Sequence, residues 1–398
     1  MIITSACNRI QRRTLIQVKI VVLSILLAAG GGPVRADTNL PAALLKESKP
    51  GTIFRIWPLE GGVRAGYKGY RVLYRSTNFN DEPVAVTGAV IFPDAAPAGK
   101  PRDVVAWAHP TTGVVSKCAP TLIPDIAGTI QGIDDLTDHG YVVVATDYVG
   151  LGARGPHPYL VGVSAARAVI DSVRAARQLK DVHAGARFAV WGHSQGGHAA
   201  LFTGLDVSSY APELTLVGVA AAAPATNLVE LFRADRATAS GRSLTAMAVL
   251  SWTRVFGFSL ATFVEKPAIP RFEALASDCI ETIADFIKES DDQKALARSF
   301  LKVDPLATPE LRSIMEKNSP GALPPGTPVF LAQGTADDLV RPAITRGYMS
   351  LLCRGGSHVK LHVMPGGSHM WAGRDSASAA VAWIGERFKG RAAPSDCR

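Results

Sequence analysis

The sequence predicts an α/β protein with a mostly parallel central sheet, helices on both faces and an inserted helical cap. Short apolar runs rich in Val, Phe or Trp recur along the chain, as expected for strands buried on both faces. Stretches with helical spacing alternate with these runs, which is typical of a parallel sheet covered on both sides. Residues 225–325 break the alternation, because they contain helical patches and no convincing strand.

The expected strands begin with a hairpin formed by "YRVLY" (70–74) and "AVTGAVIF" (85–92). The clearest helix spans residues 164–180, where apolar side chains recur at intervals of three or four and a serine opens the run. A second helix is expected over residues 195–205. Six further apolar runs are expected to be strands, at residues 103–109, 141–148, 188–193, 216–222, 328–334 and 359–365.

The cap is expected to divide the folded core into two parts. The chain has 398 residues, of which 47% are apolar and 19% charged, so it can bury one large core and carry an insertion. We expect a core of residues 37–224 and 326–398, with the cap at 225–325 ending in "SPGALPPGTP". Within the cap, "CIETIADFIKES" (279–290) has helical character. The run 244–263 carries a single charge, Arg254, and is expected to be buried or to line an acyl tunnel.

The first 36 residues have the pattern of a secretory signal peptide. Basic residues precede an apolar stretch at 20–29, and "PVRAD" (33–37) offers small residues for cleavage, expected after Ala36. A membrane anchor is the alternative, but this apolar stretch is shorter than the roughly 20 residues that span a bilayer. The pair Arg12–Arg13 also allows twin-arginine export. We therefore expect a periplasmic or extracellular protein.

The charge balance gives no indication of nucleic-acid binding. Removal of the leader takes away five basic residues and lowers the formal net charge from +8 to about +3. No cluster of Lys and Arg interleaved with aromatic residues is visible in the rest of the chain. We expect a small-molecule ester or lipid as the partner, with transient contact to a lipid interface, while the oligomeric state stays open.

A Gly-x-Ser-x-Gly motif, "GHSQG", places Ser194 between an expected strand and an expected helix. At such a turn, called a nucleophile elbow, the serine adopts a strained backbone conformation that exposes its Oγ above the sheet. A side chain at Gly192 or Gly196 would collide where strand and helix nearly touch, and Gly197 allows close helix packing. The motif alone is weak evidence, so its value depends on this context and on the partners that follow.

A serine hydroxyl needs a base, and the base needs an orienting carboxylate, in the chain order Ser, acid, His for this kind of turn. Asp337 and Asp338 follow an expected strand, and His369 lies in a glycine-rich loop after the next one. We expect Ser194, Asp337 and His369 to be catalytic, with Asp338 as the alternative acid. The other histidines precede the acid or lie in the elbow, before the last strand (His358) or within it (His362).

Two backbone amides are expected to form an oxyanion hole. The first is that of Gln195, which directly follows the nucleophile. The second is expected in "HPTTG" after the strand at 103–109. Pro110 has no N–H group, so Thr111 is the first choice and Thr112 the second.

Four cysteines remain after leader removal, Cys118, Cys279, Cys353 and Cys397. An even number in an oxidising compartment indicates two disulfides, and four cysteines allow three connectivities. No metal-binding pattern is present, because His358 and His362 on one strand face make a poor site by themselves. No cofactor is expected.

Several sequence blocks together resemble the secretory lipase family of the α/β-hydrolase superfamily. They are "WAHPTTGVVSKCAP", "DYVGLGARGPHPYLVG", "VWGHSQGGHAALFTG", "YAPELTLVGVAAAAPATNL" and "GTADDLV". The resemblance implies the α/β-hydrolase fold with a cap, hydrolysis of carboxylic esters including acylglycerols, and the triad Ser194, Asp337 and His369. It also implies disulfides Cys118–Cys279 and Cys353–Cys397. One departure is "HPTTG", where many hydrolases have His-Gly.

These observations predict a serine esterase or lipase that works through an acyl-enzyme intermediate. The triad does not distinguish esters from amides, so a secreted serine peptidase on the same scaffold is the alternative. A non-catalytic binding protein is the third hypothesis, and the presence of all three triad residues argues against it.

Overall fold

The computed structural model describes residues 38–59, 61–236, 238–280 and 301–397. The expected signal peptide lies outside these residues, as does most of the helical patch expected at 279–290. No helix in the described part of the chain is both long enough and apolar enough to cross a membrane.

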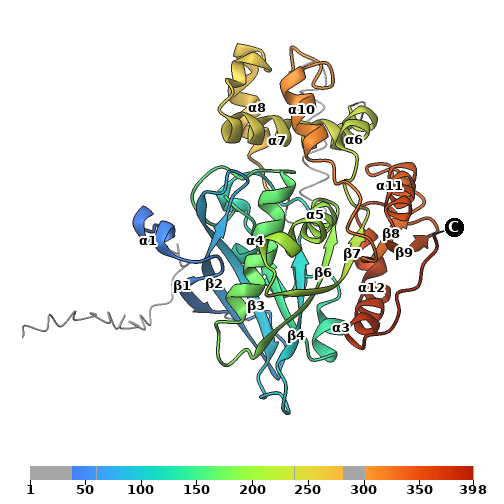
Figure 1. Cartoon of the computed structure of the whole chain (residues 1–398). Coiled ribbons are helices and arrows are strands. Elements are labelled where there is room, and N and C mark those ends of the chain that lie inside the picture. Colours follow the sequence, from blue (N-terminus) through green and yellow to red (C-terminus); the bar gives the residue numbers. More distant parts are fainter. Residues whose placement is uncertain (1–37, 60, 237, 281–300, 398) are drawn as a thin grey trace, which may run out of the picture. The chain divides into compact units, whose positions relative to one another are not determined.

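One nine-stranded sheet forms the centre of the fold, in the order β1-β2-β3-β5-β4-β6-β7-β8-β9. The strands β1 to β3 and β5 pair antiparallel in turn, and every pair from β5 through β4 to β9 is parallel. This is the α/β-hydrolase arrangement that the sequence predicts (Figure 1). The strand bounds are β1 Ile53–Pro58, β2 Tyr67–Thr77, β3 Pro83–Pro93, β4 Arg102–Ala108, β5 Val142–Thr146, β6 Ala184–His193, β7 Thr215–Ala222, β8 Pro328–Gly334 and β9 His358–Met364.

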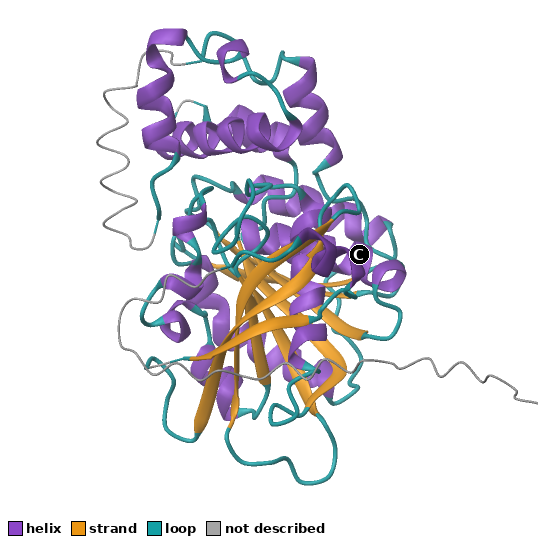
Figure 2. Ribbon diagram, turned by 90° about the vertical axis from the view of Figure 1, so that its left-hand side faces the viewer, coloured by secondary structure: helices purple, strands orange, loops and turns teal. Residues whose placement is uncertain are grey.

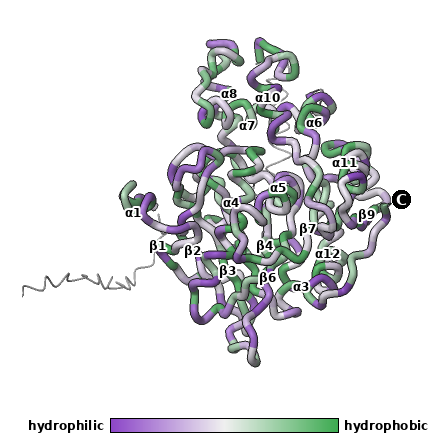
Figure 3. The backbone as a smooth tube through the Cα atoms, viewed as in Figure 1, coloured by the Kyte–Doolittle hydropathy of each residue, from purple (hydrophilic) through white to green (hydrophobic). Residues whose placement is uncertain are grey.

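Two buried clusters lie on opposite faces of the sheet. Alternate residues of β4 divide between them, with Val104 and Ala106 in one cluster and Val105 and Trp107 in the other. The first cluster joins the sheet to α4 (Gly162–Ala176), α5 (Gln195–Tyr210) and α11 (Pro342–Arg354). The second joins it to α3 (Ile133–Asp138) and α12 (Ala372–Phe388) and continues into the helices above the sheet. Figure 3 shows covering helices such as α11 alternating between hydrophobic and hydrophilic residues.

Between β7 and β8 the described chain is mainly helical, and these helices lie above one end of the sheet (Figures 1 and 2). The helix α7 begins after Thr238, whose side chain caps it, and ends at Gly257 in the left-handed conformation (φ 73°). A single isolated bridge joins Val264 to Leu301 in this region. The helices are α6 Leu228–Asp235, α7 Ala239–Phe256, α8 Ile269–Ala276 and α10 Pro309–Lys317, with 3-10 turns at Leu260–Thr262 and Lys266–Ala268.

Several local predictions need correction. The strand β1 and the short helix α1 (Ala42–Glu47) were not predicted. The helix expected over 164–180 begins at Gly162 and ends at Ala176, and the helix expected over 195–205 continues to Tyr210. His358 is the first residue of β9 rather than a residue before it. The remaining short elements are α2 (Ile126–Thr129) and 3-10 turns at Ser116–Cys118 and Pro120–Leu122.

Candidate active site

Ser194 occupies the turn between β6 and α5 with φ 57° and ψ −116°. A non-glycine residue with positive φ stores strain, which is the conformation expected at a nucleophile elbow. A Cβ atom added to Gly196 would lie 1.8 Å from the carbonyl oxygen of Ala108, and one added to Gly192 would lie 2.2 Å from that of Gly196. The explanation of the motif glycines by close approach of strand and helix is therefore confirmed.

The side chains of Ser194, His369 and Asp337 form a continuous hydrogen-bonded chain. Nε2 of His369 lies 2.9 Å from Oγ of Ser194, and Nδ1 of His369 lies 3.0 Å from Oδ2 of Asp337. Ser194 follows β6, Asp337 follows β8 and His369 follows β9. All three residues therefore lie beyond the carboxyl ends of parallel strands. His369 and Asp337 are 6% and 3% exposed, and Asp338 is exposed.

Several hydrogen-bond donors contact the carboxylate of Asp337. Its Oδ1 accepts hydrogen bonds from the backbone N–H groups of Leu339 and Val340, at 3.1 and 2.8 Å. Its Oδ2 accepts a bond of 3.1 Å from Nε2 of Gln333, which is buried at the end of β8. The sequence analysis missed Gln333, although a glutamine within the apolar run "VFLAQG" is a visible signal. These bonds fix the carboxylate in the orientation that meets the imidazole.

His193 supports the loop of His369. Its Nε2–H donates to the backbone oxygen of His369 at 3.0 Å, across 176 residues of sequence. Burial is the main cause, and the nearby ring of His369 the second cause, that lowers the pKa of His193 to about 3. The ring therefore stays neutral and donates this hydrogen bond to the loop.

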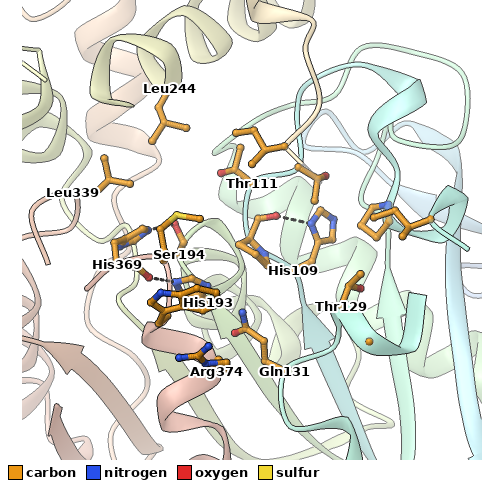
Figure 4. A pocket seen from close by; sticks show the side chains of 18 residues that line it. His109, Thr111, Thr129, Gln131, His193, Ser194, Leu244, Leu339, His369 and Arg374 are labelled. Carbon is orange, nitrogen blue, oxygen red and sulfur yellow. Dashed lines mark hydrogen bonds between the residues drawn. The ribbon is translucent and has the colours of Figure 1, made fainter. Parts of the chain in front are cut away.

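A cavity of about 500 Å³ opens beside Ser194. In Figure 4, Leu244 and Leu339 lie to one side of Ser194, with Thr129 and Gln131 on the opposite side. Thr111 and Thr112, the candidates for the second oxyanion amide, both line this cavity. A second, apolar cavity of about 30 Å³ lies between Ser194 and the helices α6 and α7, and Leu244 and Leu339 line both cavities.

Both disulfides implied by the resemblance are present in the structure. Cys118 bonds to Cys279, which connects the segment after β4 to the end of the described stretch 238–280 of the cap. The backbone N–H of Ile280 also donates to the oxygen of Thr112 at 2.9 Å. Cys353 at the end of α11 bonds to Cys397 in the carboxyl-terminal tail.

Metal ligands are not gathered at any point of the described chain, where no group of three or more His, Cys, Asp or Glu side chains could hold an ion. The ring of His362 instead stacks on Phe330, with 5.9 Å between ring centroids.

A model of the secretory lipase family matches residues 126–396, which is well over half of the chain. The chain belongs to the secretory lipase family. It is 24% identical over 370 residues to a Mycobacterium tuberculosis protein named probable inactive lipase MT1628, covering 88% of this chain and 81% of that one. Lipase 5 of Candida albicans is 26% identical over 335 residues, with coverage of 80% and 68%. The structure of Candida antarctica lipase A in its closed state superposes with a TM-score of 0.76 at 18% identity, over 93% of this chain and 89% of that one.

Three general conclusions follow from membership of this family. The protein has the α/β-hydrolase fold, its family acts on small-molecule ester or lipid substrates, and family members are secreted. One relative is named as inactive, so the family alone does not decide whether this chain is a working enzyme.

Proposed function

We propose that this chain is a secreted serine esterase or lipase that hydrolyses carboxylic esters of the acylglycerol type. One observation carries the proposal, the hydrogen-bonded chain from Oγ of Ser194 through His369 to Asp337. A serine in contact with an oriented, nearly buried imidazole can be deprotonated as it attacks a carbonyl carbon. This arrangement favours an active enzyme over a non-catalytic binding protein.

The proposed reaction has two steps. Oγ of Ser194 attacks the ester carbonyl and transfers its proton to Nε2 of His369, while Asp337 stabilises the imidazolium that forms. The backbone N–H groups of Gln195 and Thr111 stabilise the tetrahedral oxyanion. His369 then gives the proton to the departing alcohol, which leaves an acyl group on Ser194. Water, activated by the same imidazole, releases the carboxylic acid and restores the serine.

The linings of the two cavities favour an ester over a peptide with a free amino terminus. An aminopeptidase would need a carboxylate to hold the substrate ammonium, and neither cavity has an Asp or Glu among the described residues that line it. The larger cavity instead carries one cation, Arg374, at its edge. Apolar side chains such as Phe232, Leu231 and Val340 line the smaller one, which gives the site an apolar wall beside Ser194.

A panel of p-nitrophenyl esters from acetate to octanoate, with an aminoacyl anilide as control, tests this function. Each buried CH₂ contributes up to about 0.8 kcal/mol, so we expect kcat/KM to rise with chain length and to level off once the acyl chain covers the apolar lining beside Ser194. Leu244→Ala, which removes a side chain lining both cavities, is expected to move the plateau to longer chains. Faster cleavage of the anilide, with flat or falling ester rates, would contradict the proposal.

A further inference from the structure

We propose that His157 and Tyr159 are positioning residues of the oxyanion hole and that they couple both of its amides to the cap helix α7. The segment 157–159 precedes α4 and contacts three parts of the chain that are distant in sequence. The inference rests on the proposed function, since it gives these residues a role around the amides of Gln195 and Thr111.

His157 holds the side chain of Gln195. Its Nδ1–H donates to the backbone oxygen of Val149 at 2.8 Å, which leaves Nε2 as an acceptor for the amide Nε2 of Gln195 at 3.1 Å. Both side chains are 2% exposed. Burial lowers the pKa of His157 to about 4, so the ring is neutral and remains an acceptor at neutral pH. Because Gln195 is the first residue of α5, restraining its side chain restrains the peptide that follows the nucleophile.

Tyr159 supports the other side of the oxyanion hole. Its hydroxyl lies 2.9 Å from Oγ1 of Thr111, the residue expected to supply the second amide. Tyr159 is 3% exposed and Thr111 is half-buried, so the bond is partly shielded from water. Hydrogen bonds are stronger where water is excluded. This bond restrains the loop that contains Thr111. The backbone hydrogen bond between Thr112 and Ile280 restrains the same loop.

The backbone of the same segment is attached to α7. Oγ of Ser251 accepts the N–H of Tyr159 at 3.0 Å and donates to the oxygen of His157 at 2.6 Å. Nε1 of Trp252 donates to the oxygen of Tyr159 at 2.8 Å. Ser251 and Trp252 are 2% and 0% exposed, so breaking any of these bonds would leave a buried polar group without a partner. The segment therefore directs its side chains to the side chains of Gln195 and Thr111 and its backbone to α7.

These hydrogen bonds should stabilise the transition state more than they strengthen substrate binding. Oxyanion donors must lie within a narrow range of distances, and a displacement of about 1 Å can cost about 100-fold in rate. The ground-state ester is expected to be held mainly by apolar contacts in the cavities. Tyr159 and Gln195 also line the smaller cavity, but Tyr159→Phe keeps the aromatic ring and removes only the hydrogen bond. Loss of the support should therefore lower kcat and leave KM nearly unchanged.

Tyr159→Phe is the primary test, because it removes only the hydroxyl that contacts Thr111. We expect kcat for p-nitrophenyl esters to fall about tenfold, KM to change less than twofold, and the affinity for an alkyl boronic acid, which forms a tetrahedral adduct on the serine, to fall by a similar factor. Tyr348→Phe is the matched control, since that buried hydroxyl donates to Gly321 on the α11 side of the sheet. Unchanged kcat and unchanged boronic acid affinity in Tyr159→Phe would overturn the inference.

Ser251→Ala tests the coupling to the cap. Ser251 lines neither cavity, yet its removal is expected to lower kcat several-fold with little change in KM. Thr253→Val, which removes a hydroxyl bonded to the Leu250 oxygen in the same helix, should leave both constants unchanged. Equal kcat in the two variants would overturn the coupling. An inert wild-type protein would refute the proposed function itself, whereas an active wild type with two unaffected positioning variants would refute only this inference.

Discussion

Nε2 of His369 lies 2.9 Å from Oγ of Ser194, although 175 residues separate the two in sequence. This contact predicts that Ser194→Ala abolishes ester hydrolysis while the fold is retained. Loss of the nucleophile should cost on the order of 10⁴-fold or more in turnover. Initial rates on p-nitrophenyl butanoate, with a thermal midpoint as folding control, provide the measurement. Ser209→Ala, on the exposed part of α5, should keep full activity, and a tenth of normal activity in Ser194→Ala would remove Ser194 from the role.

The two neighbouring aspartates should differ sharply in importance. Asp337→Asn places an amide where Nδ1 of His369 needs an acceptor, so the imidazole adopts the wrong tautomer, and we expect kcat to fall by about 10³- to 10⁴-fold. Asp338→Asn alters an exposed side chain and should change kcat less than about threefold. Side-by-side kinetics on one ester decide the ranking, and the reverse order would transfer the acid's role to Asp338.

Stability should fall as the pH is lowered below about 6.5. Burial lowers the pKa of His109, His157 and His198 to about 4 and that of His193 to about 3, against about 6.5 in an unfolded chain. Between those values the unfolded state binds protons that the folded state does not, so the free energy of unfolding decreases as pH falls. Asp171, whose pKa burial raises to about 6, opposes this over the same range. Burial also raises the pKa of Asp103, Asp147 and Asp206, which act in the same direction as Asp171.

Each of the four histidines lowers the free energy of unfolding by about 1 kcal/mol between pH 6.5 and 5.5, and we expect their sum to exceed the opposing effect of the aspartates. Urea unfolding at four pH values from 7.5 to 4.5 measures it, with activity loss recorded separately. Nε2–H of His198 donates to the backbone oxygen of Asn318. His198→Phe should therefore reduce, by about one, the number of protons that unfolding takes up in this pH range, even where the substitution lowers overall stability. The same pH dependence in His198→Phe and in the wild type would show that the ring of His198 is not neutral in the folded state.

The disulfide between Cys353 and Cys397 should stabilise the carboxyl-terminal part of the core. It closes a loop with a sequence separation of 44 residues, which corresponds to about 3 to 4 kcal/mol in the chain-entropy account. The double substitution Cys353→Ser with Cys397→Ser is expected to lower the urea midpoint accordingly. Non-reducing peptide mapping of exported protein checks that both linkages form, and four free thiols would contradict the expectation.

Most of the sheet could be predicted because its strands are buried on both faces and read as continuous apolar runs. The bounds of β8 coincide with the run at 328–334. By contrast, β1 pairs with a neighbour on one side only and leaves Ile56 48% exposed, so its sequence "IFRIWP" lacks that signal. The end of α4 came four residues earlier than its apolar spacing indicated, because the N–H groups of Gln178 and Leu179 turn back to residues 175 and 176 in a tighter turn.

The candidate site was predictable where a motif or chain order constrains it. The elbow glycines and the order of serine, acid and base pointed to Ser194, Asp337 and His369, and their catalytic roles stay a prediction until variants are measured. The contacts of His157 with Gln195 and of Ser251 with Tyr159 join segments 38 and 92 residues apart. No spacing rule relates such segments, because only packing of the cap on the core brings them together.

The insertion of the cap between β7 and β8 separates the halves of the site along the chain, with Ser194 before it and both Asp337 and His369 after it. A polypeptide is synthesised from its amino terminus, so the nucleophilic serine emerges from the ribosome long before its base does. Until the last strand docks, Ser194 is an ordinary alcohol without a proton acceptor. The proposed hydrolytic activity therefore requires a chain that is complete through His369.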